Sequence, residues 1–170
     1  MIQFISLSSG SNGNCYYLGN EQTALLIDVG IGGRTIKKRL EDNNLSISNV
    51  QMILVTHNHI DHIKYLGSVA DRLSVPVYAP SGIHQALEVH PCTKGTMNGC
   101  KRVIKKETFV QNRGVKFVAF DVPHDAVETV GYYIDFFGEK FVFMTDLGDV
   151  PEAAMEYCRM ADHLIIESNF

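Results

Sequence analysis

A cluster of histidine and aspartate side chains follows an apolar segment in the first half of the chain. The sequence THNHIDH comes directly after the apolar residues 52–55. A chain with only 7 histidines in 170 residues rarely produces such an H-x-H-x-D-H spacing by chance. In extended backbone, His57 and His59 project to the same side and can share one metal ion. Asp61 and His62, after a turn, would face a second metal position, as in two-metal hydrolases.

Two more candidate ligands follow apolar segments in the second half of the chain. His124 comes after the strand-like segment 115–122 and Pro123, and Asp146 follows the strand-like segment 139–145, whose residues 141–144 are all apolar. A sheet holds residues at its strand ends rigidly, and a carboxylate there is well placed to bridge two metal ions. A single histidine or aspartate at such a position is often structural. The assignment of His124 and Asp146 as metal ligands therefore depends on the presence of the first cluster.

Asp28 ends a third apolar run, Leu25-Leu26-Ile27, and precedes a glycine-rich turn. We interpret its carboxylate as a group outside the ligand set that orients a metal-binding histidine. The alternative is a dinucleotide-binding loop. That alternative is weak because the glycines at 30, 32 and 33 lack the third glycine of the G-x-G-x-x-G spacing.

The candidate ligands require a strand-rich framework to position them. Strand-like segments, separated by Gly, Asn and Pro, are predicted at 2–7, 14–18, 23–29, 51–55, 75–79, 115–122, 129–136, 139–145 and 162–167. Helical patterns are predicted at 33–43, 64–74, 82–89 and 151–160. Several strands are apolar at every position and should be covered on both faces. We therefore predict an α/β chain of two sheets with helices outside them.

The composition is typical of a single globular domain over residues 1–170. The net charge of -4 argues against a general polyanion binder but allows local basic patches. The four cysteines form no C-x-x-C pair and are predicted to be reduced. The N-terminus lacks the features of a signal peptide, and no apolar run approaches the ~20 residues that span a bilayer. We expect a cytoplasmic protein with no membrane association.

The last segment, residues 164–170, has the pattern of a buried strand that reaches the end of the chain without a closing turn. Chain termini more often end in polar residues that fray. We therefore expect that the C-terminal part of the domain is absent from this sequence.

Together the motifs resemble those of the metallo-β-lactamase fold superfamily. Its T-H-x-H-x-D-H signature matches residues 56–62, and Asp28, His124 and Asp146 match its other motifs in order. The resemblance implies a four-layered αββα sandwich with a site for two metal ions at one edge of the sheets. The implied ligands are His57, His59 and His124 for the first ion, Asp61 and His62 for the second, and Asp146 between them.

A narrower resemblance is to the YycJ-like (WalJ) branch, whose members are regarded as bacterial nucleases. It is carried by the segments 6–17, 122–126 and 166–169. In that branch the chain continues, and a last histidine ligand lies in the continuation. The resemblance implies a phosphodiesterase, most simply a DNA exonuclease, that uses a hydroxide bridging two divalent metal ions. Asp61 would be the catalytic group that orients this hydroxide or accepts its proton.

The sequence defines the identity of the metal and of the substrate less closely than it defines the ligands. Imidazole-rich ligation suits zinc, and the carboxylates leave manganese or iron open. Basic clusters at 34–39 and 101–106 favour a nucleic acid partner, although such runs are usually solvated surfaces. Because the superfamily site also hydrolyses thioesters, lactams and lactones, a glyoxalase II-type thioesterase or other small-molecule hydrolase is the alternative. A di-iron redox module is a further alternative, but the sequence around Asp61 keeps the hydrolase pattern.

Overall fold

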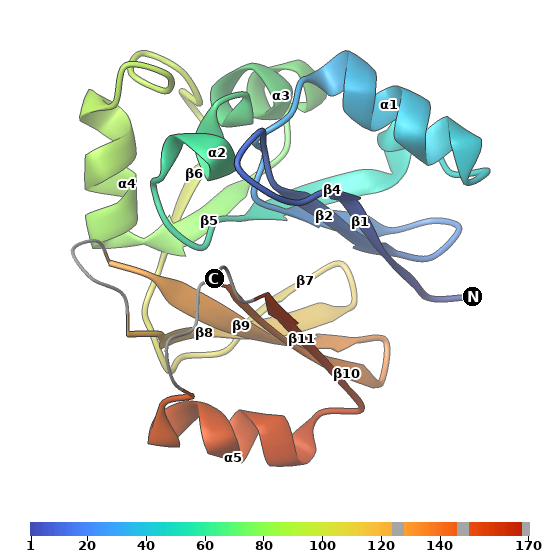
Figure 1. Ribbon diagram of the computed structural model, residues 1–170, viewed down its shortest axis with the longest axis vertical. Coiled ribbons are helices and arrows are strands. Elements are labelled where there is room, and N and C mark those ends of the chain that lie inside the picture. Colours follow the sequence, from blue (N-terminus) through green and yellow to red (C-terminus); the bar gives the residue numbers. More distant parts are fainter. Residues whose placement is uncertain (124–127, 146–149, 168–170) are drawn as a thin grey trace. The chain divides into compact units, whose positions relative to one another are not determined.

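A computed structural model describes residues 1–123, 128–145 and 150–167 (Figure 1). The chain divides into two compact units, Met1–Val103 and Ile104–Phe170. Each unit is built on its own sheet. That residues 1–170 form a single domain stays a prediction.

The first unit is built on a six-stranded sheet in the order β1-β2-β3-β4-β5-β6. Its strands are β1 (Gln3–Ser8), β2 (Cys15–Gly19), β3 (Ala24–Ile27), β4 (Val50–Leu54), β5 (Val77–Pro80) and β6 (Lys101–Ile104). The first three strands are antiparallel neighbours, whereas β3, β4 and β5 run parallel. Every residue of β2 and β3 is buried, which agrees with their uninterrupted apolar sequences.

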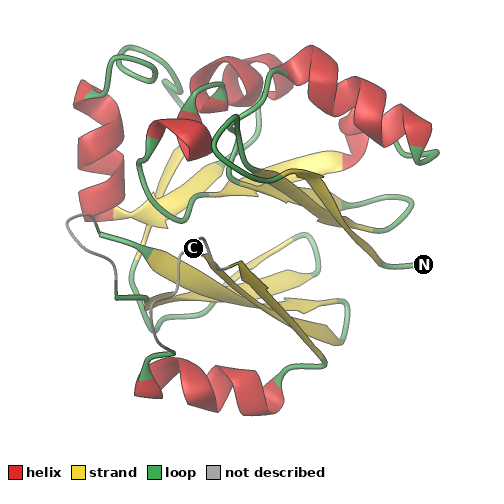
Figure 2. Ribbon diagram, viewed as in Figure 1, coloured by secondary structure: helices red, strands yellow, loops and turns green. Residues whose placement is uncertain are grey.

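The helices of the first unit connect its parallel strands and cover one face of the sheet (Figure 2). They are α1 (Gly33–Asp42), the 3₁₀ helix η1 (Ile47–Asn49), α2 (Ile60–Ile63), α3 (Leu66–Leu73) and α4 (Ser81–Val89). Helix α1 buries Ile36 and Leu40, one turn apart, and α3 buries Leu66, Val69 and Ala70. These apolar stripes fix which face of each helix packs inward, so the polar face of α1 remains exposed.

The second unit is built on a five-stranded sheet in the order β11-β10-β9-β8-β7. Its elements are β7 (Val110–Asn112), β8 (Val115–Asp121), β9 (Val130–Phe136), β10 (Glu139–Thr145), α5 (Glu152–Met160) and β11 (His163–Glu167). Helix α5 packs through Tyr157 and Cys158 on a buried cluster that includes Phe120 and Met144. Strands β8 and β10 are both antiparallel to β9, so they run in the same direction and end at the same edge.

The structure departs from the predicted elements in two places. The helix predicted at 64–74 is α3, which is shorter at both ends, and Lys64 and Tyr65 separate it from the short helix α2, which the sequence did not predict. The interruption is stabilised from outside the segment, because Tyr65 N donates to the carbonyl oxygen of Val29 (3.0 Å). The stretch 90–114 contains β6 and β7, which the sequence did not reveal because these strands are short and partly exposed. Among the described residues, no helix has the length and apolar character needed to cross a membrane.

Candidate metal centre

The site begins where two parallel strands of the first sheet end. Asp28 directly follows β3, and Thr56 and His57 come just after β4. Because β3 and β4 are parallel neighbours, their carboxyl ends lie at the same edge of the sheet. The backbone N–H of Asp28 donates to the carbonyl oxygen of Leu54 (2.9 Å), which joins the two chain segments beyond the strands.

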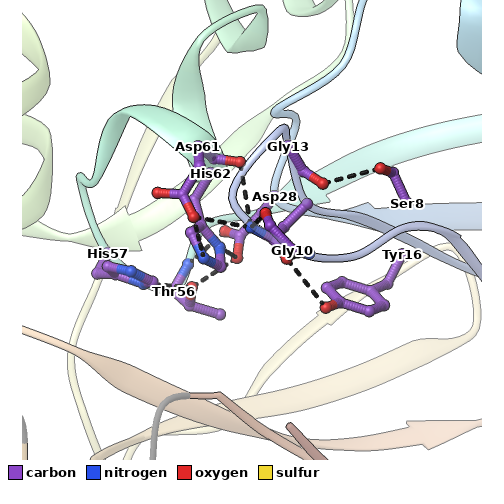
Figure 3. A network of polar contacts seen from close by, with 10 residues as sticks. Ser8, Gly10, Gly13, Tyr16, Asp28, Thr56, His57, Asp61 and His62 are labelled. Atoms are coloured by element: carbon purple, nitrogen blue, oxygen red, sulfur yellow. Dashed lines mark hydrogen bonds and ion pairs between the residues drawn. The ribbon is translucent and has the colours of Figure 1, made fainter. Parts of the chain in front are cut away.

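The Asp28 carboxylate is fully buried and accepts three hydrogen bonds (Figure 3). Its Oδ1 accepts from the backbone N–H of Thr56 (2.8 Å). Its Oδ2 accepts from Thr56 Oγ1 (2.6 Å) and from His62 Nδ1 (2.7 Å). Burying a carboxylate costs free energy unless the carboxylate is paired by hydrogen bonds. Thr56, after β4, and His62, on α2, provide this pairing for Asp28.

The backbone of Asp28 has a positive φ of 61°, in the left-handed region. Non-glycine residues seldom adopt this conformation, although aspartate tolerates it better than most. The conformation turns the chain sharply at the end of β3, where the Asp28 carboxylate meets Thr56 and His62. Such strain is typical of sites where side-chain geometry matters more than stability.

These hydrogen bonds determine which nitrogen of each imidazole carries the proton. An ionised carboxylate only accepts, so His62 Nδ1 must donate to Asp28, and the lone pair of neutral His62 lies on Nε2. The hydroxyl proton of Thr56 is used toward Asp28, so Thr56 Oγ1 accepts from His57 Nδ1 (2.8 Å). His57 is therefore also an Nδ1–H tautomer with its lone pair on Nε2, the form in which histidine binds a metal.

Three imidazoles lie together at this edge of the sheet. The ring centroids of His57 and His62 are 4.1 Å apart, and those of His57 and His59 are 4.7 Å apart. His57 and His62 are buried, and His59 is partly exposed. One ligand atom each from Asp28, His57 and His62 lies within 4.8 Å of the other two.

Asp61 and His62 lie on the short helix α2, which follows His59 directly. Asp61 Oδ2 is 3.7 Å from His62 Nε2, so the carboxylate faces the nitrogen that carries the His62 lone pair. The side chain of Asp61 is 27% exposed. Asp61 is thus the acidic group of the cluster that solvent can reach.

Asn14 also belongs to this site, although it is not among the predicted ligands. Asn14 is 1% exposed, and its side-chain Nδ2 donates to Asp61 Oδ2 (3.0 Å). Its backbone N–H donates to the carbonyl oxygen of Asp61 (2.7 Å), and its Oδ1 accepts from Gly10 N (3.0 Å). The available signal was an asparagine that ends a polar, glycine-rich loop directly before the buried strand β2.

Gly30 allows the loop after Asp28 to pack directly on α2. A Cβ atom at Gly30 would lie 1.9 Å from the carbonyl oxygen of Asp61 and 2.6 Å from the backbone N of Asn14. Gly30 N also donates to the carbonyl oxygen of Asn14 (2.8 Å). The glycine therefore serves close backbone packing around Asp61 and not a dinucleotide.

The remaining predicted ligands, His124 and Asp146, lie outside the described residues. The strands that precede them, β8 and β10, end at the same edge of the second sheet. The structure thus brings together His57, His59, Asp61, His62 and Asp28, and it leaves the places of His124 and Asp146 as predictions.

Comparison with known proteins identifies the family. Residues 23–170 match the family model described as Beta-lactamase superfamily domain, and the chain belongs to this family. It is 34% identical over 169 residues to exodeoxyribonuclease YycJ of Bacillus anthracis, covering 99% of this chain and 63% of that protein. It is 31% identical over 168 residues to exodeoxyribonuclease WalJ of Streptococcus pneumoniae, covering 99% and 62%. The predicted resemblance to the superfamily and to its YycJ-like (WalJ) branch is confirmed.

Solved structures support the same fold. The metallo-beta-lactamase fold protein YhfI from Bacillus subtilis superposes with a TM-score of 0.75 at 16% identity, over 99% of this chain and 71% of that one. Rm3 metallo-beta-lactamase gives a TM-score of 0.68 at 17% identity, over 92% and 72%. The predicted α/β class with two sheets and helices is confirmed. The chain spans somewhat under two thirds of the length of the curated relatives YycJ and WalJ.

Proposed function

We propose that this chain is a metal-dependent hydrolase that cleaves phosphodiester bonds in DNA as an exonuclease. The observation that carries the proposal is the buried pair of imidazoles of His57 and His62, whose ring centroids are 4.1 Å apart and which Thr56 and Asp28 hold through hydrogen bonds at the ends of β3 and β4. Both imidazoles are held as Nδ1–H tautomers, which is the form that binds divalent metal ions through Nε2. The substrate class follows the names of the relatives YycJ and WalJ, both exodeoxyribonucleases.

The donor set fits two divalent metal ions, with zinc favoured because imidazoles dominate. His57, His59 and His124 would hold the first ion, and Asp61 and His62 the second, with Asp146 shared between them. Asp28 fits a different role, because both of its carboxylate oxygens are already engaged by Thr56 and His62. It would orient His62 directly, and it would orient His57 through the Thr56 hydroxyl.

Bound divalent ions would supply Lewis acidity toward the phosphate and lower the pKa of water to about 7. The protein's own contribution is positional. Asp61 is the partly exposed carboxylate of the site and is placed to accept or hold a proton beside the reacting groups. Asn14 fixes the direction of that carboxylate through its Nδ2–H, and it fixes the Asp61 backbone through its own N–H.

The proposal is tested by loading the chain with zinc or manganese and measuring cleavage of end-labelled single- and double-stranded DNA. Asp61→Asn should reduce cleavage by about 10²–10⁴-fold, the range for a general acid or base. Glu41→Gln is the matched control because it removes an exposed carboxylate on α1 that is not a candidate ligand. Metal content is measured on all three proteins. Wild-type protein that carries metal and cleaves no phosphodiester would contradict the proposal.

A second candidate, thioester hydrolysis, is favoured by one relative. The hydroxyacylglutathione hydrolase of Nitrosomonas eutropha is 24% identical over 146 residues, covering 86% of this chain and 50% of that protein. Parallel assays with a hydroxyacylglutathione thioester and DNA separate the candidates. Turnover of the thioester without DNA cleavage would assign the chain to this second class.

A further inference from the structure

A hollow of about 370 Å³ lies between α1, η1 and α3 in the first unit. We call it the α1–α3 hollow. Ile47, Val69 and Leu73 give it an apolar floor, and Arg34, Lys37 and Arg72 stand around it. The size is within the range of small-ligand sites, and the lining offers both apolar and cationic contacts.

Among the described residues, the charged groups of Arg34, Lys37 and Arg72 have no partner within the protein. Across residues 1–123, 128–145 and 150–167, the side chains of Arg34, Lys37 and Arg72 form no hydrogen bond or ion pair. All three residues are exposed. Their charges are therefore available to an external anion.

The arrangement of these cations opposes helix stability. Arg34 and Lys37 are three residues apart, so their like charges share one face of α1. Arg34 lies in the first turn of the helix, where the backbone dipole disfavours cations, and that turn contains no acidic residue to compensate. Arg72, by contrast, is in the last turn of α3, where a cation is favourable. The like charges of Arg34 and Lys37, and the position of Arg34 in the first turn, cost helix stability that a bound anion would offset.

The hollow is connected to the candidate metal centre by short segments of the same unit. The loop after Asp28 leads into α1 at Gly33, and α3 follows the helix that carries Asp61 and His62. Figure 1 shows α1, α2 and α3 along the same face of the first sheet. Tyr65, between α2 and α3, is 38% exposed, lies against Gly32, and has Lys64 Nζ 5.6 Å from its ring centroid.

We infer that the α1–α3 hollow binds one nucleotide of a single-stranded DNA substrate, away from the bond that is cleaved. Arg34, Lys37 and Arg72 contact its phosphates, and the apolar floor of Ile47, Val69 and Leu73 receives its base. This inference rests on the proposed function, because it assigns the substrate of that site. A single strand is favoured over a duplex because only an unpaired base can enter a hollow of this size.

Known single-strand binding surfaces combine the same two features. Basic side chains follow the phosphates, and apolar or aromatic side chains pack on the bases. Exposed Tyr65, beside Lys64, offers a stacking surface of this kind between the hollow and α2. The surface from α2 to the hollow thus offers a DNA strand both kinds of contact, basic side chains for the phosphates and apolar or aromatic side chains for the bases.

Binding of a fluorescein-labelled single-stranded oligothymidylate, measured by anisotropy in EDTA, tests the inference without cleavage. The triple variant Arg34→Gln, Lys37→Gln, Arg72→Gln should bind at least about tenfold more weakly than the wild type. Its slope of log affinity against log salt should be shallower by about 2, because roughly 0.7 counterions are released per phosphate contact on single strands. The charge-matched control Lys94→Gln, Lys116→Gln, Lys140→Gln lies outside both basic clusters and should bind as the wild type does.

The base contact is tested with an oligonucleotide of the same length that carries abasic sites. Wild-type protein should bind the abasic strand more weakly than oligothymidylate. Equal binding of the two strands, equal binding by the hollow variant and the wild type, or equal loss in the hollow and control variants would each overturn the inference. Thermal unfolding of each variant shows whether it is folded.

Failure of the proposed function is detected separately. Hydrolysis of bis(p-nitrophenyl) phosphate by metal-loaded wild-type protein reports on the metal centre without requiring a DNA strand. Both proposals are supported if the wild-type protein hydrolyses this ester and the hollow variant loses binding of the DNA strand. If the wild-type protein hydrolyses the ester but the hollow variant binds the DNA strand as tightly as the wild type does, only the inference about the hollow is overturned.

Discussion

Asn14 holds Asp61 at two points: its side-chain amide donates to the Asp61 carboxylate at 3.0 Å, and its backbone N–H donates to the Asp61 carbonyl oxygen at 2.7 Å. The two residues are 47 positions apart in sequence. The Asn14 side chain is itself fixed, because its Oδ1 accepts from Gly10 N and its Nδ2 also donates to the Gly10 carbonyl oxygen. The orientation of Asp61 is therefore set by the loop before β2 as well as by α2.

Replacing Asn14 should impair catalysis more than substrate binding. Asn14→Ala removes the donor to Asp61 Oδ2, and we expect kcat to fall about 10–100-fold with little change in KM, as for other groups that orient catalytic ligands. Asn14→Asp should be worse because it places a second carboxylate beside Asp61. Steady-state kinetics on DNA, with metal content measured in parallel, check this prediction. A change in KM alone would assign Asn14 a role in substrate binding instead.

Thr56 should act through its hydroxyl group and not through its shape. The hydroxyl donates to Asp28 and accepts from His57, so Thr56→Val breaks both bonds while it keeps the side-chain volume. We expect Thr56→Val to weaken metal binding about 10–100-fold, and Thr56→Ser to retain it. Competition titrations with a chromophoric chelator measure both. Equal affinities in the two variants would show that the hydroxyl does not orient His57.

Gly30→Ala should destabilise the fold around Asp61. The added methyl group would lie 1.9 Å from the Asp61 carbonyl oxygen, so backbone must shift at a cost of at least about 1–3 kcal/mol in unfolding free energy. Gly33→Ala is the control, because its nearest neighbour would be Val69 at an ordinary 3.6 Å. Urea unfolding gives both values. Similar stabilities of the two variants would contradict the close packing described here.

The stability of the chain should depend on pH through His84, which is 3% exposed. Burial lowers the pKa of His84 below its usual 6.5, and its Nε2 bonds the carbonyl oxygen of Arg102 at 3.0 Å. The unfolded state therefore takes up the proton first, so the stabilisation present above pH 6.5 is lost as pH falls through that value toward the lower folded pKa. His84→Gln retains a donor for Arg102 and should show a shallower fall between pH 7 and 5. Parallel pH profiles of wild type and variant would contradict this.

The elements that could be predicted from the sequence are those whose local residue pattern agrees with their place in the tertiary structure. The apolar run of β3 fixes a fully buried strand, and the H-x-H-x-D-H spacing brings three imidazoles together. Ser74, by contrast, fits a continuing helix, but it adopts a left-handed conformation with φ of 53° that ends α3 at Leu73.

The features that the sequence did not predict depend on contacts between distant segments. The break between α2 and α3 depends on the bond from Tyr65 to Val29, and the role of Asn14 depends on its contact with Asp61. No periodicity within either segment encodes these contacts. The exposed residues Arg102 and Val103 of β6 likewise carry no alternation that marks a strand.

The proposed metal centre depends on two imidazole ligands, His57 oriented by Thr56 for the first divalent ion and His62 oriented by Asp28 for the second. The most direct test is zinc binding by EDTA-stripped protein, measured by chelator competition, for the wild type, His57→Ala and the control His163→Ala, whose side chain is 49% exposed. The account predicts that His57→Ala weakens binding by more than about 100-fold, since even groups that only orient a ligand contribute 10–100-fold, and that His163→Ala binds as the wild type does. Equal zinc affinity in all three proteins would contradict it.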